Sequence, residues 1–185
     1  MAPLLLVTMS CGSREVPIIG DETVCEPSVD AELIEVIDGD TVDVRRSGAS
    51  EVERVRLLGV QAGEIFQDDG EQACASQDDG DCCYGLEAEA WLEDLLDRAD
   101  SLVLGFDAEC TDTYGRTLGY LWIDDPEDPD ALDPWFINEQ LLTQGIARYF
   151  DEEIGEAQNI RFKDDFEAAE SEAAAQALGL WSVCE

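Results

Sequence analysis

The tripeptide Asp38-Gly39-Asp40 lies between two runs rich in β-branched and apolar residues, 32–37 and 41–46. An Asp-Gly pair in this setting is a strong signal of a tight turn that joins two strands. The sequence therefore predicts a strand on each side of the turn. Ser47-Gly48-Ala49 predicts a second turn, and the alternation of side chains over 51–58 predicts a third strand.

The rest of the chain adds helices and two more strands. Apolar residues recur at helical spacing over 86–99, and the runs 101–106 and 118–123 have the composition of strands. Two later helices are predicted, each followed by a glycine that suits a helix end, at 137–144 and 162–178. Five strands with one helix between the third and fourth suit a small closed barrel of the OB type, so we expect an α+β domain.

We expect a single domain over 31–185, preceded by a polar linker over 12–30 that contains proline and glycine. Residues 1–11 form a short apolar run ending at Cys11, as bacterial lipoprotein signals do. This pattern predicts an exported protein attached to a membrane through a lipid on Cys11, with plain secretion as the alternative. Removing Cys11 would leave six cysteines, an even number suited to three disulfides.

The chain carries 45 acidic and 10 basic residues, a formal net charge of −35, and no histidine. The lack of histidine excludes Ser-His-Asp triads, Cys-His pairs and imidazole zinc sites. Because the acidic residues are spread along the whole chain, they indicate a solvated acidic surface, as in a salt-adapted or strongly soluble exported protein. The alternative is a surface that binds polycations or Ca²⁺. Either surface should repel nucleic acid at low salt.

Three stretches carry residues suited to phosphate chemistry, namely 37–42, 56–64 and 111–120. A phosphodiester is anionic, and its transition state gathers further charge on oxygens that the planar forks of Arg56 and Arg116 can bind. Since histidine is absent, a carboxylate such as Glu64 is the group that would position water. The alternative roles are a surface salt bridge for Arg56 and a solvated loop acid for Glu64.

These stretches resemble the signatures of the staphylococcal nuclease (thermonuclease) family, and that family's helix landmarks follow in the same order. The landmarks lie at 83–88, 138–148, 166–173 and 179–182. The resemblance spans 32–182 and implies a five-stranded barrel with three helices. It also implies a Ca²⁺-dependent endonuclease acting on DNA and RNA, in which water attacks phosphorus in line and the 5′-oxygen leaves.

By position, the resemblance implies roles for five residues. Arg56 and Arg116 would hold the phosphate and the developing charge, and Glu64 would orient or deprotonate the attacking water. Asp40 would bind the metal ion, and Tyr114 would contact the substrate phosphate.

Three positions depart from the family pattern. Gln61 stands where a second metal-binding aspartate is usual, and its neutral carbonyl oxygen would leave a weaker Ca²⁺ site. Gly63 replaces a proline and is expected to loosen the loop that aims Glu64. Thr113 stands where a lysine is common, which lowers the expected affinity for the substrate.

Cys83 and Cys110 lie in loops that the implied fold places beside the active site, so a Cys83–Cys110 disulfide is expected. Free thiols and other pairings are the alternatives. The remaining cysteines are expected to pair as Cys74–Cys82 and Cys25–Cys184.

Two functions follow from these observations. The first is an exported, monomeric nuclease with Arg56, Glu64 and Arg116 as its reaction centre and a Ca²⁺ ion at Asp40. The second is a non-catalytic OB-type binding module at the cell surface, favoured by Gln61 and by the net charge of −35.

A third hypothesis concerns two Asp-Asp-Gly repeats, at 68–70 and 78–80, the second followed by Asp81. They would form a separate Ca²⁺ loop, so that the acidic loops mainly store the ion. Their spacing does not match a helix-loop-helix calcium site, and solvated turns are the alternative.

Overall fold

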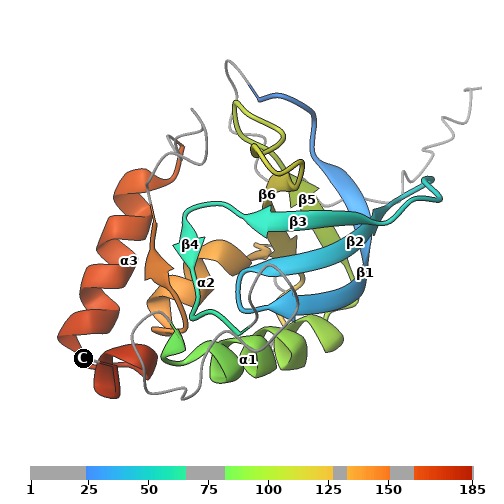
Figure 1. Cartoon of the computed structure of the whole chain (residues 1–185). Coiled ribbons are helices and arrows are strands. Elements are labelled where there is room, and N and C mark those ends of the chain that lie inside the picture. The colour runs from blue at the N-terminus through green and yellow to red at the C-terminus, as the bar shows by residue number, and fades with distance from the viewer. Residues whose placement is uncertain (1–23, 66–81, 127–132, 151–160, 185) are drawn as a thin grey trace, which may run out of the picture.

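The computed structural model describes residues 24–65, 82–126, 133–150 and 161–184. Five strands form a barrel (Figure 1), and they are β1 (Val29–Asp38), β2 (Thr41–Arg46), β3 (Glu53–Leu57), β5 (Leu102–Gly105) and β6 (Thr117–Ile123). They follow the order β3-β2-β1-β5-β6 with antiparallel neighbours, and a parallel pairing of β3 with β6 closes the ring. The predicted five-stranded OB-type barrel is therefore confirmed.

Three helices complete the domain, as predicted: α1 (Gly85–Asp97), α2 (Ile137–Thr143) and α3 (Lys163–Ala175). Helix α1 packs against β1, and α3 packs against α2 (Figure 1). Three strands of two residues each lie outside the barrel. Of these, β4 (Val60–Gln61) pairs with β8 (Arg148–Tyr149), and β7 (Trp135–Phe136) pairs with β6. A short 3₁₀ helix, η2 (Gly179–Ser182), follows α3.

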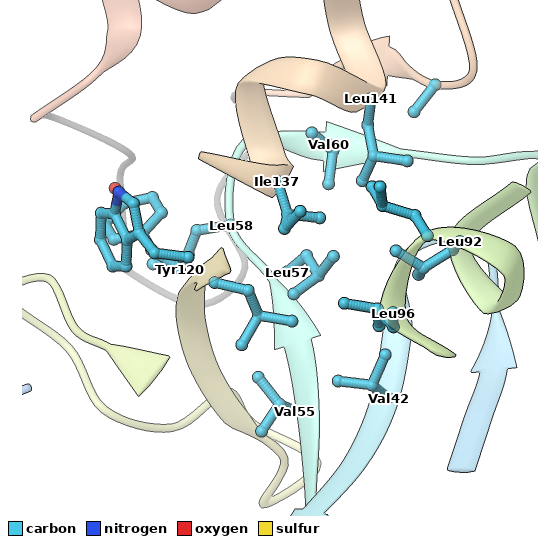
Figure 2. Close-up of a cluster of buried hydrophobic side chains, with 14 of the residues drawn as sticks. Val42, Val55, Leu57, Leu58, Val60, Leu92, Leu96, Tyr120, Ile137 and Leu141 are labelled. Carbon is cyan, nitrogen blue, oxygen red and sulfur yellow. The ribbon is translucent and has the colours of Figure 1, made fainter. Parts of the chain in front are cut away.

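The hydrophobic core lies inside the barrel and under its helices (Figure 2). Val42 of β2 and Val55 and Leu57 of β3 are fully buried, and they face Leu92 of α1 and Ile137 of α2. Burying a valine or leucine side chain contributes about 1.5–3 kcal/mol relative to leaving it exposed. This packing therefore holds β3 and the turn before β2 in fixed positions.

Close packing at Gly39 determines the turn between β1 and β2. A Cβ atom on Gly39 would lie 2.5 Å from the Ala88 Cβ on α1 and 2.6 Å from the Ala62 Cβ. Glycine is required because no larger residue fits this approach. The turn therefore places Asp40 directly against the loop that follows β4.

Most predicted elements are found with small shifts at their ends. Strand β2 has the predicted bounds, and α1 begins and ends within two residues of 86–99. Strand β1 begins at Val29, two residues before the expected start of the domain. The two-residue strands β4, β7 and β8 were not predicted, because two residues are too few to show a periodic pattern.

The two disulfides found within the described ranges differ from the predicted pairs. Cys25 bonds to Cys110 and Cys83 bonds to Cys184, so the expected Cys83–Cys110 and Cys25–Cys184 pairs are wrong. Cys110 lies before β6, beside the segment where the Cys25 N–H donates to the Asp107 carbonyl oxygen. Cys83 lies at the start of α1, which is close to the C-terminal end of the chain (Figure 1). Each cysteine is thus bonded to a residue near one end of the chain, Cys110 to Cys25 and Cys83 to Cys184.

Several predictions concern residues outside the described ranges. Cys82 is disulfide-bonded, but Cys74, its predicted partner, is not among the described residues. The same applies to Cys11, to the signal expected over 1–11, to most of the linker expected over 12–30, and to the repeats at 68–70 and 78–80 with Asp81. Within the described ranges, no helix is both long and apolar enough to cross a bilayer.

Candidate active site

Arg56 lies near the end of β3, and only 5% of its side chain is exposed. Its Nη1 atom lies 2.9 Å from Asp40 Oδ1 and donates to the Leu57 carbonyl oxygen at 3.1 Å. Its Nη2 atom donates to Gln61 Oε1 at 2.9 Å. A buried guanidinium needs such partners, since an unpaired buried charge is strongly destabilising. Arg56 is therefore in a buried ion pair, and the alternative of a surface salt bridge is wrong.

Asp40 is buried at the turn between β1 and β2. Its Oδ1 atom accepts a hydrogen bond from Thr41 Oγ1 at 3.1 Å and faces Arg56. Its Oδ2 atom accepts from the Ala62 N–H at 2.7 Å. The carboxylate thus joins the β1–β2 turn, β3 and the loop after β4. Next to it, burial and the charge of Asp40 raise the pKa of Asp38 to about 7.

Gln61 and Glu64 lie in the segment after β3, and Gln61 connects that segment to Arg56. Gln61 Nε2 donates to Glu64 Oε1 at 3.1 Å, while Gln61 Oε1 accepts from Arg56. Glu64 is an exposed residue whose carboxyl group is partly desolvated, and this partial burial raises its pKa, as does the charge of Asp40. The charges of Arg56 and Arg116 and the hydrogen bond from Gln61 act in the opposite direction, without cancelling the rise. The result is a carboxylate of raised pKa close to a buried guanidinium.

Gly63 packs tightly against the start of α1. A Cβ atom there would lie 2.5 Å from the Cys83 carbonyl oxygen and 2.8 Å from the Gly85 nitrogen. The expectation that glycine at this position loosens the loop is therefore wrong. Its small size lets the loop touch α1, and the Cys83–Cys184 disulfide lies beside that contact.

Arg116 and Tyr114 lie in the turn that precedes β6. Both oxygens of the buried Asp112 hold this turn, because Oδ1 accepts from the N–H groups of Tyr114 and Arg116, and Oδ2 accepts from Arg116 Nε at 2.6 Å. Burial acts to raise the pKa of Asp112, but the hydrogen bonds and charge of Arg116 outweigh it and lower that pKa. Gly115, with φ of +84°, supplies the left-handed residue that the turn needs.

Both side chains of this turn reach solvent. The Arg116 side chain is 32% exposed, and Tyr114 is 82% exposed. The Arg116 guanidinium lies 5.6 Å from the centre of the Tyr114 ring.

The side chains predicted to converge do so to different degrees. Asp40, Arg56 and Glu64 are connected through contacts in which Gln61 is the intermediate. The turn that carries Arg116 leads into β6, where Leu118 is the register partner of Arg56 on β3, and the charge of Arg116 acts to lower the pKa of Glu64. The structure thus connects Asp40, Arg56 and Glu64. The convergence of Arg116 with them stays a prediction, as do the chemical roles of all four side chains.

The parts played by Asp38 and Asp112 were not predicted from the sequence. Asp38 accepts a hydrogen bond from the Asp40 N–H at 2.9 Å, and Asp112 holds the turn that carries Arg116. Both lie inside the quoted motifs. An acidic residue two positions before Asp40 and another four positions before Arg116 were signals that could have found them.

The site fits a Ca²⁺ ion poorly. Calcium takes six to eight oxygen ligands, several of them carboxylates. Both oxygens of Asp40 already accept hydrogen bonds, and the Gln61 carbonyl oxygen faces Arg56. In the part of the chain that the structure describes, no group of three or more Asp, Glu, His or Cys residues is arranged to hold a metal ion.

Comparison with known proteins places this geometry in a family. The family model described as staphylococcal nuclease homologue matches residues 54–183. The uncharacterized protein MJ1439 of Methanocaldococcus jannaschii is 30% identical over 159 residues, which cover 81% of this chain and 70% of that protein.

Relatives with nuclease names are also found. The SPbeta prophage-derived endonuclease YokF of Bacillus subtilis is 30% identical over 157 residues, covering 83% of this chain and 44% of that protein. The thermonuclease of Staphylococcus intermedius is 29% identical over 148 residues, covering 79% of this chain and 72% of that protein. With the family model matched over most of the chain and the barrel closed as the motifs imply, this protein belongs to the staphylococcal nuclease family.

Proposed function

We propose that this protein is a nuclease that hydrolyses phosphodiester bonds of DNA or RNA. The observation that carries the proposal is the connected set of Arg56, Gln61 and Glu64, together with Arg116, whose charge acts to lower the pKa of Glu64. Attack of water on a phosphodiester needs a group that accepts a proton and groups that stabilise negative charge. A carboxylate of raised pKa and two guanidinium groups supply these functions. The nuclease names of two relatives support the same reaction class.

In this proposal the two arginines bind the phosphate and Glu64 is the general base for the attacking water. Arg56 and Arg116 donate hydrogen bonds to the phosphate oxygens, and these bonds strengthen as charge builds in the transition state. Glu64 accepts a proton from the attacking water while the new phosphorus–oxygen bond forms. The bond from phosphorus to the 5′-oxygen breaks, and that oxygen takes a proton from solvent. Tyr114 donates to a phosphate oxygen from the rim of the site.

The raised pKa of Glu64 suits it to act as the general base. A general base works best when its pKa approaches the working pH, because it then has more affinity for the proton while still being ionised. Family membership also implies calcium, which would supply positive charge to the phosphate, and Asp40 would be its side-chain ligand in a weakened site. Since the oxygens of Asp40 and Gln61 are already engaged, no step is assigned to the ion.

We also propose that the protein is exported and works as a monomer. Disulfides at Cys25–Cys110 and Cys83–Cys184 suit an oxidising compartment. Lipid attachment at Cys11 belongs to the same proposal. The net charge of −35 then suits a salt-rich medium, where screening weakens repulsion of the polyanionic substrate.

The test is cleavage of single- and double-stranded DNA and RNA by the purified protein, from about 0.1 M to about 1 M salt, over which the screening length falls from about 10 Å to about 3 Å. We expect cleavage that rises from low to moderate salt and falls about 10²–10³-fold in Arg116→Ala. Arg98→Ala is the matched control, because Arg98 is an exposed arginine paired with Asp94 on α1.

Cleavage that persists unchanged in Arg116→Ala, or no cleavage under any condition, would contradict the proposal. The second outcome would favour a binding module without activity. That alternative, a module that binds a protein or another ligand, predicts that Ca²⁺ and nucleotide bisphosphates leave the melting temperature unchanged, and a clear rise with both would count against it.

A further inference from the structure

We propose that Gln61 is a positioning residue that joins Arg56 to Glu64 and lets the reaction centre work without a bound calcium ion. This inference rests on the proposed nuclease function, and it extends that function to a residue whose role there is otherwise unassigned. Gln61 is one of the three positions at which this chain departs from the family pattern, and it is the one that contacts both Arg56 and Glu64. The departure therefore has a structural consequence that can be measured.

The side-chain amide of Gln61 is used at both ends. Its Oε1 atom accepts from Arg56 Nη2 at 2.9 Å, and its Nε2 atom donates to Glu64 Oε1 at 3.1 Å and to the Ala62 carbonyl oxygen at 3.1 Å. A guanidinium offers only donors, and an ionised carboxylate and a carbonyl offer only acceptors. The amide therefore has one orientation that satisfies all three neighbours, and a flipped amide would satisfy none.

The backbone on both sides of Gln61 is also held. Gln61 ends β4, where its register partner on β8 is Arg148. The next residue, Ala62, is buried and donates its N–H to Asp40 Oδ2 at 2.7 Å. The backbone at Gln61 is therefore fixed. The side-chain amide of Gln61 can thus hold Glu64, which is an exposed residue, in a defined position.

A carboxylate at position 61 would work differently. An aspartate could accept from Arg56, but it would add a negative charge beside Glu64 and Asp40, and carboxylates that share a site repel one another. A cation bound between these carboxylates would relieve that repulsion. Calcium binds to oxygen ligands in this arrangement. The neutral amide of Gln61 turns a donor toward Glu64 instead. It thereby holds the carboxylate by a hydrogen bond.

The main effect of Gln61 should fall on turnover. Glu64 serves the water in the chemical step, and a misplacement of about 1 Å in such a group can lower the rate about 10²-fold. Arg56 keeps its contacts with Asp40 and the Leu57 carbonyl oxygen when Gln61 changes, so phosphate binding should be largely retained. Gln61→Glu is the sharpest substitution, because it keeps the length and the acceptor for Arg56 and removes the donor to Glu64.

The experiment compares wild type, Gln61→Glu and Gln61→Asp in chelator and in excess Ca²⁺, with kcat and KM measured separately and Ca²⁺ binding followed by calorimetry. Gln144→Glu is the control, since it adds the same charge at an exposed residue at the end of α2. We expect wild type to cleave equally in both buffers. Gln61→Glu should lose about tenfold or more in kcat with KM within about twofold.

Gln61→Asp should bind Ca²⁺ more tightly than wild type, and added Ca²⁺ should restore its activity. Loss of wild-type cleavage in chelator, or unchanged kcat in Gln61→Glu, would overturn the inference while leaving the nuclease function intact. Absence of cleavage by wild type in both buffers would overturn the proposed function. The calorimetric comparison still tests the inference in that case, because equal Ca²⁺ binding by wild type and Gln61→Asp would overturn it independently.

Discussion

Arg56 and Arg116 bring the same side chain to one site by different structural means. Arg56 lies on a barrel strand with 5% of its side chain exposed, whereas Arg116 lies on a turn with 32% exposed. Each pairs with a buried aspartate, Asp40 or Asp112. Arg56 has further acceptors on Gln61 and the main chain, but Asp112 is the carboxylate that holds both Arg116 and the turn itself.

The difference separates what the fold fixes from what local contacts fix. Arg56 is positioned by the packing of β3 in the barrel, so removing it disturbs the interior. Arg116 is positioned by a turn whose base is joined to the segment before β1 by the Cys25–Cys110 disulfide. Asp112 holds the Arg116 side chain through Nε, and the side chain is partly exposed to solvent, while the location of its turn depends on a covalent link. Three predictions test this contrast, in order of their expected effect on cleavage.

The largest effect is expected from Arg56→Ala. Breaking a buried ion pair leaves an uncompensated charge on Asp40, so the free energy of unfolding should fall by about 3–5 kcal/mol, and cleavage should be lost. Arg116→Ala should also lower cleavage about 10²–10³-fold. Its unfolding free energy should fall by less, about 1–3 kcal/mol, since the Arg116 side chain is partly exposed and the buried Asp112 keeps hydrogen bonds from two backbone N–H groups. Urea unfolding at neutral pH measures both changes.

Arg54→Ala is the control for that comparison. Arg54 lies on the same strand, but it is exposed and paired with Asp43, so its removal should change unfolding by about 0–1 kcal/mol. Equal destabilisation by Arg56→Ala and Arg116→Ala would show that the contrast between strand and turn is mistaken.

The same contrast shows what the sequence could reveal. Asp40, Arg56 and Glu64 lie in short motifs on consecutive strands and turns, so their proximity was predictable from strand order. The burial of Arg56 was not, because arginine is normally a surface residue and the burial depends on Asp40 and Gln61 being folded against it. The Gln61 bridge depends on β4 and β8, which are too short to leave a sequence pattern.

The predicted disulfide pairs were wrong for a related reason. Cysteine pairing depends on which chain ends meet in space, and six cysteines allow 15 pairings that sequence spacing does not rank. Cys110 was placed correctly beside the turn of Arg116, but its partner comes from the segment before β1, which was expected to be a linker. The sequence motifs therefore predicted the residues of the proposed reaction centre better than they predicted the disulfides that hold its segments.

A smaller effect on cleavage is expected when the Cys25–Cys110 link is removed in the double variant Cys25→Ser with Cys110→Ser. The disulfide joins residues 85 positions apart, and its loss should lower the unfolding free energy by about 2–4 kcal/mol. The turn carrying Arg116 then loses its anchor, so kcat/KM should fall about tenfold even under conditions where the protein stays folded.

The double variant Cys83→Ser with Cys184→Ser is the matched control. It should lose similar stability but less activity, because hydrogen bonds to Asp40 and Gln61 still hold the loop that carries Glu64. If both double variants lose the same activity, the disulfide at Cys110 has no special link to Arg116. Chemical denaturation and steady-state assays on the two variants decide between these outcomes.

The smallest effect on cleavage, and the clearest on stability, is expected from the aspartates beside the two arginines. The pKa of Asp38 is raised to about 7, so between about pH 4 and 7 the folded protein keeps a proton that the unfolded chain releases. Its contribution to stability is present below about pH 4 and is lost as pH rises, at up to about 1.4 kcal/mol per pH unit. Asp38→Asn should remove this decline, measured by urea unfolding in chelator across that range.

Asp112 should show the opposite slope. Its pKa is lowered in the folded protein, so its contribution is present above about pH 4 and is lost as pH falls below that value. Asp112→Asn should therefore destabilise most at neutral pH and least in acid, where wild type loses the same contribution. Parallel pH profiles for the two variants would mean that Asp38 is ionised in the folded state as Asp112 is. The charge around Arg56 would then be balanced like that around Arg116, and burial would be the only difference between the two halves of the site.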